Sequence, residues 1–136
     1  MSNYRRGASF ENSVANRFDK HGFLAVRAAG SGTTSRTCID VIAVNDKVIA
    51  LCECKTHKDD AVGKEFTYDV DQVLDSYSRV VGKNGDGKIG RRVVIMLVVK
   101  NKDGGVAEYF DVSEDERVVP GDGISLYKFI NEYGEK

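Results

Sequence analysis

The sequence predicts one α/β domain, residues 1–136, in which a mixed β-sheet is flanked by helices. Three observations support this prediction. The chain of 136 residues has the length of a single domain. Hydrophobic residues make up 41% of it and charged residues 30%, which permits a packed core and argues against wholesale disorder. Helix-spaced and strand-like apolar segments follow one another in the order α-β-β-β-α-β-β-α.

The first half of the chain is predicted to contain one helix and three strands. Within residues 8–20, Phe10, Val14 and Phe18 recur at the spacing of one helix face. Gly22 occupies the place where a glycine commonly follows a helix end. The three β-rich segments that come next are residues 23–28, 38–44 and 48–55.

The second half is predicted to contain a helix, two strands and a final helix. Apolar residues have helical spacing over residues 69–81. Residues 92–99 form a nearly continuous apolar run, typical of a strand buried on both faces, and residues 106–112 indicate an adjoining strand. The last helix is predicted from four apolar residues and a terminal glycine: Ile124, Tyr127, Phe129, Ile130 and Gly134.

The formal net charge of -1 conceals an asymmetry along the chain. Residues 1–102 carry 17 Lys and Arg against 12 Asp and Glu, whereas residues 103–136 carry 3 against 9. The first part is therefore basic and the second acidic, so the body of the protein could present a positive face to DNA or RNA. Ordinary solvated charge explains the same composition equally well.

Several protein classes are disfavoured by the sequence. No apolar run approaches the roughly 20 residues of a membrane helix, and the polar first residues lack a secretory signal. The cysteines, Cys38, Cys52 and Cys54, are odd in number and do not suggest a disulfide framework. The expectation is a cytoplasmic protein with no membrane contact.

Two carboxylates and a lysine are the residues most informative about chemistry. In an antiparallel hairpin that turns at Asn45 and Asp46, Asp40 lies near the far end of the next strand. Glu53 and Lys55 occupy that end and, by strand alternation, share one side of it. Such a cluster could hold Mg²⁺ for phosphodiester hydrolysis, with the lysine orienting water or neutralising charge. Charged ends of an ordinary surface strand explain the pattern about as well.

The pattern of Asp40, Glu53, Cys54 and Lys55 resembles the D…(D/E)-x-K core of the restriction-endonuclease-like nuclease superfamily. The stretch from Arg5 to Lys58 is similar to the archaeal Holliday junction resolvases and their viral relatives. Three further segments carry that similarity: residues 6–11 (RGASFE), residues 22–32 (GFLAVRAAGSG) and residues 40–44 (DVIAV). One departure is Ile39, where the family often has proline.

The resemblance implies a role for each matching residue. The implied catalytic residues are Glu11, Ser31, Asp40, Glu53 and Lys55. The implied metal ligands are Glu11, Asp40, Glu53 and the backbone carbonyl of Cys54. The implied DNA-binding residues are Arg5, Arg6, Arg27, Ser31, Arg36 and Gln72.

The resemblance further implies a Mg²⁺-dependent endonuclease, with Mn²⁺ able to substitute, that acts as a homodimer on branched, four-way DNA and cuts it symmetrically. It would act in the cytoplasm of an archaeal cell or, if virus-encoded, of the host. No nucleotide cofactor is expected, because the Gly30–Gly32 loop lacks the lysine and helix start of a P-loop. Two alternatives stay open: a restriction- or repair-type nuclease with another DNA substrate, and a non-catalytic DNA-binding module. A pure protein-interaction domain is a further possibility.

Other motifs receive structural interpretations. Cys52 and Cys54 share one strand face and are interpreted as core residues and not as zinc ligands. His57 is interpreted as an exposed loop histidine. Residues 83–89 resemble the middle of an EF-hand loop but lack its end ligands, so a glycine-rich turn is expected there. That turn could meet DNA through four basic residues: Lys83, Lys88, Arg91 and Arg92. The strand over 92–99 and the C-terminal helix are both left as candidate dimer surfaces.

Overall fold

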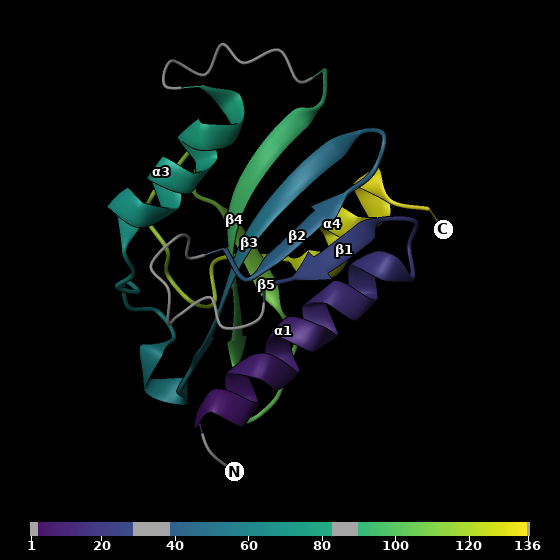
Figure 1. Ribbon diagram of the computed structural model, residues 1–136. Helices are drawn as coiled ribbons and strands as arrows, with labels where there is room; N and C mark the ends of the chain where they lie inside the picture. Colours follow the sequence, from purple (N-terminus) through teal and green to yellow (C-terminus); the bar gives the residue numbers. More distant parts are fainter. Residues whose placement is uncertain (1–2, 29–38, 83–89, 136) are drawn as a thin grey trace.

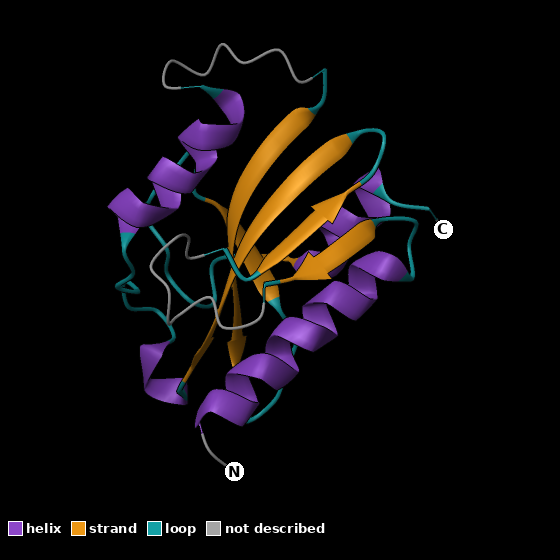
Figure 2. Cartoon of the chain, in the orientation of Figure 1, coloured by secondary structure: helices purple, strands orange, loops and turns teal. Residues whose placement is uncertain are grey.

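The structure is a computed structural model that describes residues 3–28, 39–82 and 90–135, with side chains described from Ser9 onward in the first helix. Figures 1 and 2 show one curved sheet with helices packed on both of its faces. The helical elements are α1 (Asn3–Asp19), the 3-10 turn η1 (Asp59–Ala61), α3 (Val70–Val81) and α4 (Leu126–Tyr133). The strands are β1 (Leu24–Arg27), β2 (Val41–Val44), β3 (Val48–His57), β4 (Arg92–Asn101), β5 (Glu108–Asp111) and β6 (Ile124–Ser125).

The described strands form one mixed sheet in the order β1-β2-β3-β4-β5-β6. β3 and β4 run parallel in a ten-residue register from Val48↔Arg92 to His57↔Asn101. The other neighbouring pairs are antiparallel. The parallel pair requires a crossover, which η1 and α3 provide. The predicted mixed sheet flanked by helices is confirmed.

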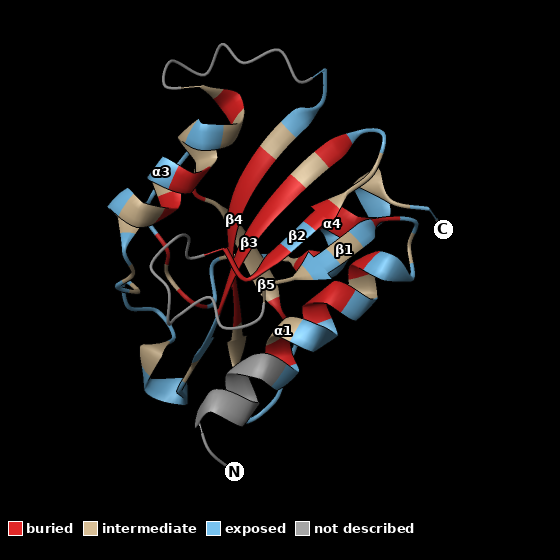
Figure 3. Ribbon diagram, viewed as in Figure 1, coloured by how far each residue is buried: buried red, intermediate tan, exposed pale blue. Residues whose placement is uncertain are grey.

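Two apolar cores lie on opposite faces of this sheet. On one face, α1 and α4 cover the even-numbered residues of β3, from Val48 to Cys54. On the other face, α3 packs through Val73 onto Leu51 and the odd-numbered residues of β4. Figure 3 shows the resulting buried band through β3 and β4. Strand alternation thus assigns the side chains of β3 to two separate cores.

The hairpin between β2 and β3 has the predicted turn. The side-chain oxygen of Asn45 accepts hydrogen bonds from the backbone N–H groups of Lys47 and Val48, at 2.9 and 3.0 Å. Its amide donates to the carbonyl of Tyr133 at 2.8 Å, which ties the end of α4 to the hairpin. The turn sets the register Val41↔Cys52, which brings the residue before β2 alongside the far half of β3.

The element boundaries differ from the predicted ones at several places. β3 and β4 extend to His57 and Asn101, beyond the apolar residues that predicted them. Ile124 was predicted in the last helix but lies in the two-residue strand β6. The helix begins one residue after Ser125, whose hydroxyl accepts a hydrogen bond from Tyr127 N–H. Such a short strand has no periodic pattern of its own, because only its partner β5 defines it.

The exposure of each strand indicates which parts of the sheet a second chain could contact. β4, one of the two predicted candidates for a dimer surface, lies between β3 and β5, and its residues from Val94 to Val99 are buried. Those six residues are therefore not available for contact with a second chain in this structure. Leu24, Val26 and Ile42 are exposed apolar side chains on β1 and β2. No helix among the described residues is long and apolar enough to cross a membrane.

Candidate active site

The candidate site lies where β2 begins and β3 continues past it. β2 pairs with β3 only as far as Val41↔Cys52, so residues 53–57 of β3 extend beyond their β2 neighbours. Asp40, Glu53 and Lys55 meet at this step in the sheet, and Glu11 of α1 approaches it from one face. The structure therefore brings together the four charged residues that the sequence predicted as catalytic. The fifth predicted catalytic residue, Ser31, lies outside the described residues.

Asp40 is fixed by backbone hydrogen bonds on both sides. Its N–H donates to the carbonyl of Cys52 and its own carbonyl accepts from Ala28 N–H, each at 2.8 Å. Its carboxylate oxygen Oδ2 accepts from Cys54 N–H, also at 2.8 Å. The side chain thus takes the place that the next residue of β2 would have occupied beside β3. Asp40 is only 8% exposed, so its position is set by the sheet and not by solvent.

Glu53 and Lys55 project from the same side of β3, as alternation predicts. Glu53 is 5% exposed, and its Oε1 lies 3.5 Å from Nζ of Lys55. The lysine side chain is about half exposed. A buried carboxylate at the end of an apolar strand is costly unless it is compensated by a cation. This arrangement is more specific than the charged end of an ordinary surface strand.

Glu11 and Arg27 form an ion pair next to this cluster. The distance from Arg27 Nε to Glu11 Oε2 is 3.2 Å, and Arg27 Nη1 also donates to Asn12 Oδ1 at 3.4 Å. Burial raises the pKa of the Glu11 carboxyl, and the Asp40 carboxylate raises it further, whereas Arg27 and Lys55 act in the opposite direction. Burial and the neighbouring Asp40 carboxylate thus disfavour the charged form of Glu11, and Arg27 and Lys55 favour it.

Cys52 and Cys54 belong to the core on the α1 side, as the sequence predicted. Burial raises the pKa of the Cys54 thiol well above its ordinary value, and the nearby Cys52 and Asp40 add to the effect. A metal-binding cysteine must be a thiolate, so this environment disfavours a ligand role for the sulfur. The N–H and carbonyl of a strand residue point the same way, so the Cys54 carbonyl faces the edge where Asp40 binds its N–H.

The donor chemistry of the cluster fits a hard divalent cation. Within the described side chains, no three His, Cys, Asp or Glu residues lie close enough together to hold a metal ion. Glu11, however, is turned toward Arg27, while Asp40 and Glu53 are buried at the step in the sheet. Carboxylate and carbonyl oxygens are the ligands that Mg²⁺ and Mn²⁺ accept. The electrostatic repulsion between Glu11 and Asp40 is what a bound cation would relieve.

The predicted DNA-binding residues are only partly described. Arg5 and Arg6 lie in the first turns of α1, and their side chains are outside the described part, as are Ser31 and Arg36 entirely. Gln72 lies in the first turn of α3, where its N–H donates to the side chain of Asp69. The turn over residues 83–89 also lies outside the described residues.

Sequence reasoning missed two residues near the site. Asn12 contacts Arg27, and its only sequence signal is its position next to Glu11. Tyr68 packs against the core on the α3 side and donates a hydrogen bond to the carbonyl of Glu116 at 2.6 Å. Burial raises the pKa of Tyr68 to about 12, and the charges of Glu116 and Glu53 contribute. Tyr68 and Phe66 are thus partly buried against the core on the α3 side.

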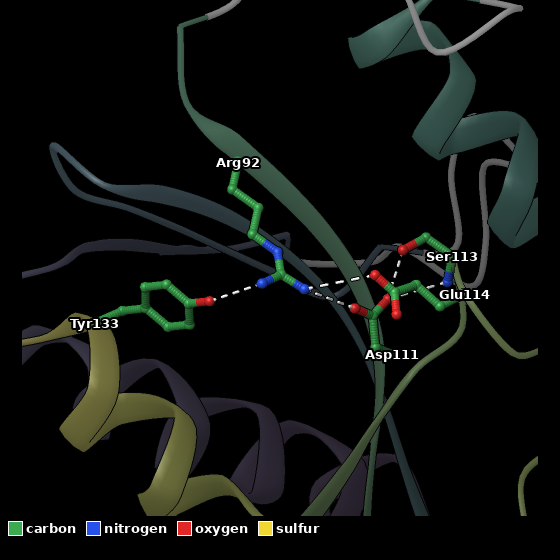
Figure 4. A network of polar contacts seen from close by, with 5 residues as sticks. All are labelled: Arg92, Asp111, Ser113, Glu114 and Tyr133. Atoms are coloured by element: carbon green, nitrogen blue, oxygen red, sulfur yellow. Dashed lines mark hydrogen bonds and ion pairs between the residues drawn. The ribbon is translucent and has the colours of Figure 1, made fainter.

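A second polar network lies at the opposite end of β3 and β4. Figure 4 shows Arg92, at the start of β4, between the side chains of Tyr133 and Asp111. Arg92 Nη1 donates to the Tyr133 hydroxyl at 2.9 Å, and Nη2 lies 3.5 Å from Asp111 Oδ2 and 3.7 Å from Glu114 Oε1. Arg92 was a candidate for DNA contact, but the structure uses it to join β4, β5 and α4.

Comparison with known proteins identifies similar chains. A family model described as "Archaeal holliday junction resolvase (hjc)" matches residues 2–135. The chain is 32% identical over 81 residues to "Crossover junction endodeoxyribonuclease Hjc" of Methanocaldococcus jannaschii. That match covers 58% of this chain and 54% of the relative, so it spans about half of the relative's length.

One solved structure is similar in fold. It is the 1.6 Å structure of Archaeoglobus fulgidus Hjc, described as a Holliday junction resolvase from an archaeal hyperthermophile. The TM-score is 0.64 at 22% sequence identity, over 91% of this chain and 98% of that one. This likeness supports the fold, and the family assignment rests on the match along almost the whole chain.

Proposed function

The chain belongs to the archaeal Holliday junction resolvase family, and from this premise we propose that it is a metal-dependent endonuclease that resolves four-way DNA junctions. It would cut the phosphodiester bonds in symmetric pairs, and residues 1–136 would form one nuclease domain. The observation that carries the proposal is the pair of buried carboxylates, Asp40 and Glu53, with Lys55 at one edge of the sheet. Buried charge of this kind lowers stability and is typical of catalytic sites.

Membership of this family implies dependence on a divalent metal ion, and we propose Mg²⁺, with Mn²⁺ able to replace it. Asp40, Glu53 and the Cys54 carbonyl would hold the ion, and Glu11, which is paired with Arg27 here, would supply the third carboxylate. The bound ion would supply Lewis-acid polarisation of the phosphoryl group and a lowered pKa of water. The buried setting of Asp40 and Glu53 would keep both ligands in position.

The remaining side chains would bind and orient the DNA. Lys55, half exposed beside Glu53, would orient the attacking water or neutralise developing charge. Arg27 would bind a backbone phosphate once Glu11 turns to the metal site. We propose the same phosphate-contacting role for the other predicted residues: Arg5, Arg6, Ser31, Arg36 and Gln72. Contacts to phosphates position the DNA without reading its sequence, so branch shape would determine the substrate.

We further propose that the active form is a homodimer. The described residues of one chain form the carboxylate cluster of Asp40 and Glu53 once, and two symmetric cuts require two such clusters held at a fixed separation. The protein would act on DNA in the cytoplasm of an archaeal cell or of a virus-infected host. Analytical ultracentrifugation should give twice the 15.0 kDa chain mass at working concentration. A monomer that still makes paired cuts would contradict the dimer.

The proposed activity is tested with an end-labelled four-way junction and a linear duplex of the same sequence. We expect symmetric paired cuts in the junction alone with Mg²⁺, and none with EDTA. Glu53→Gln should abolish cleavage while leaving junction binding largely intact, because the amide keeps the size of the buried side chain and removes only its charge as a metal ligand. Equal cutting of both substrates would favour a nuclease of another substrate class. Salt-sensitive binding without any cutting would favour a DNA-binding module.

A further inference from the structure

The edge of β3 beyond the carboxylate cluster, which no described strand pairs with on the β2 side, offers a second set of groups suited to an anion. β2 stops pairing at Cys52, whereas β3 continues to His57 alongside β4. On the β2 side, the N–H of Cys54 is bound by Asp40. On the β4 side, the carbonyl of His57 accepts from Lys102 N–H at 2.9 Å. Because successive strand residues point to alternate sides, the N–H of Thr56 points to the same open edge as that of Cys54.

Thr56 has no internal function that would explain its polar groups. The residue is exposed, and beyond its place in the ladder with β4 it makes no hydrogen bond or ion pair within the described part of the chain. By strand alternation the hydroxyl of Thr56 lies on the α1 face, from which Glu11 approaches the cluster, and its N–H points to the edge where Asp40 lies. No described residue occupies either donor, so both can serve a ligand. Two donors on one residue at an open strand edge suit an oxyanion.

Lys100 adds a positive charge to the same place. Thr56 and Lys100 are register partners, and both are even-numbered residues on the α1 face of the sheet. Side chains directly opposite on neighbouring strands lie close together. Lys100 is half-buried and forms no ion pair with a described residue, unlike Lys55, Arg27 and Arg92. No described carboxylate therefore compensates the charge of its ammonium group.

The surrounding charges favour a discrete site over a broad basic surface. Lys58 and Lys102 are exposed nearby, but so are Asp60 and Asp103. The carboxylate of Asp59 is occupied by the side-chain amide of Asn101. Because both signs of charge surround the ends of β3 and β4, this surface would not attract DNA along its whole length. What distinguishes one point on it is the register pair of Thr56 and Lys100, which offers a backbone N–H, a hydroxyl and an ammonium group.

We propose that Thr56 and Lys100 bind the DNA phosphate next to the one that is cleaved. The inference rests on the proposed nuclease function and adds two residues to its DNA-binding surface. Thr56 lies two strand residues beyond Cys54, or about 6.7 Å. That step is comparable to the separation of neighbouring phosphates along one DNA strand. A phosphate held at this edge would fix the register in which the scissile phosphate meets Asp40 and Glu53.

The proposal is tested by junction binding in EDTA, where no cleavage occurs. Thr56→Val keeps the shape of the side chain but loses the hydroxyl, and should weaken binding about 3-fold. Lys100→Met keeps the aliphatic stem and should weaken binding about 10-fold. Lys47→Met is the matched control, because Lys47 is an exposed lysine at the other end of β3 and makes no ion pair with a described residue. It should bind as the unaltered protein does.

A methylphosphonate scan around the branch point then identifies the phosphate concerned. Replacing the phosphate next to the cleaved one should weaken binding by the unaltered protein, and Lys100→Met should show no further loss there. Equal binding by all variants, or the same methylphosphonate penalty in both proteins at every position, would overturn the proposal. Failure of the unaltered protein to cut the junction would refute the nuclease function instead, because the scan reads binding without cleavage.

Discussion

The two ends of the β3–β4 pair use charged residues in opposite ways. At the end where the strands begin, Arg92 is surrounded by Asp111, Glu114 and the hydroxyl of Tyr133, and each charge has a partner of opposite sign. At the end where they finish, Glu53 and Asp40 are buried, and Asp40 raises the pKa of Glu11. The first end joins three elements, whereas the second concentrates negative charge at one edge of the sheet.

This difference separates stability from function along the same two strands. Exposed ion pairs such as those of Arg92 contribute little each, and their value is structural. Buried carboxylates that repel one another lower stability and persist where they have a chemical use. Thr56 and Lys100 extend the functional end by a few residues, since the hydroxyl of Thr56 and the ammonium group of Lys100 have no hydrogen-bond or ion-pair partner among the described residues. Substitutions at the two ends should therefore affect different measurements.

The largest contrast is expected between two aspartates, one at each end. Asp40→Asn should reduce junction cleavage at least about 100-fold. Losing a residue that only hydrogen-bonds a metal ligand costs up to about 100-fold, and losing the ligand itself should cost more. Asp111→Asn should leave cleavage unchanged and lower the free energy of unfolding by about 0.5 kcal/mol, because its ion pair with Arg92 is partly exposed. Single-turnover cleavage and urea unfolding measure the two effects.

The same pair of variants can contradict the separation. If Asp111→Asn also lost cleavage while remaining folded, the Arg92 end would have a part in catalysis. If Asp40→Asn lost junction binding together with cleavage, the residue would be required for folding or for holding DNA, and its assignment as a metal ligand would be wrong. Circular dichroism distinguishes a folding defect from a binding defect.

At Glu11, a substitution is expected to lower cleavage but to raise stability. Glu11→Gln should reduce cleavage about 10-fold or more, because the third carboxylate is lost. The same change should raise the urea midpoint, since burial and Asp40 raise the pKa of this carboxyl and so penalise its charged form at neutral pH. Glu114→Gln, at the exposed side of the Arg92 network, is the control and should alter neither property appreciably. A lower midpoint for Glu11→Gln would mean that its ion pair with Arg27 outweighs the repulsion.

How far the sequence predicted the site depends on the range of each contact. Asp40 and Glu53 could be placed together because a short turn at Asn45 fixes the register of one hairpin. The pairing of Glu11 with Arg27 could not, because it depends on how α1 crosses β1. Similarly, Arg92 and Lys100 are both basic residues on one strand. Arg92 is distinguished from Lys100 only by its contacts with residues much later in the chain, which are Asp111, Glu114 and Tyr133.

The fold shows the same limit. Long strands with continuous apolar runs, such as β4, were predicted in type and position, although the last two residues of β4, Lys100 and Asn101, were not. β6 was missed because two residues carry no period, and its existence depends on pairing with β5. The extension of β3 to His57 was also missed, because Thr56 and His57 resemble loop residues until the parallel ladder with β4 is known. That extension carries Thr56, for which we proposed binding of a DNA phosphate.

The smallest predicted effect is at Arg92, where a substitution should change stability without changing junction binding. Arg92→Met keeps the aliphatic stem and removes the guanidinium, which is about half exposed, so the free energy of unfolding should fall by only about 0.5–1 kcal/mol. The difference from the unaltered protein should shrink in 1 M salt, because exposed ion pairs are screened there. Junction binding should not change, in contrast to Lys100→Met on the same strand. A loss of binding comparable to that of Lys100→Met would place Arg92 on the DNA surface and remove the distinction between the two ends.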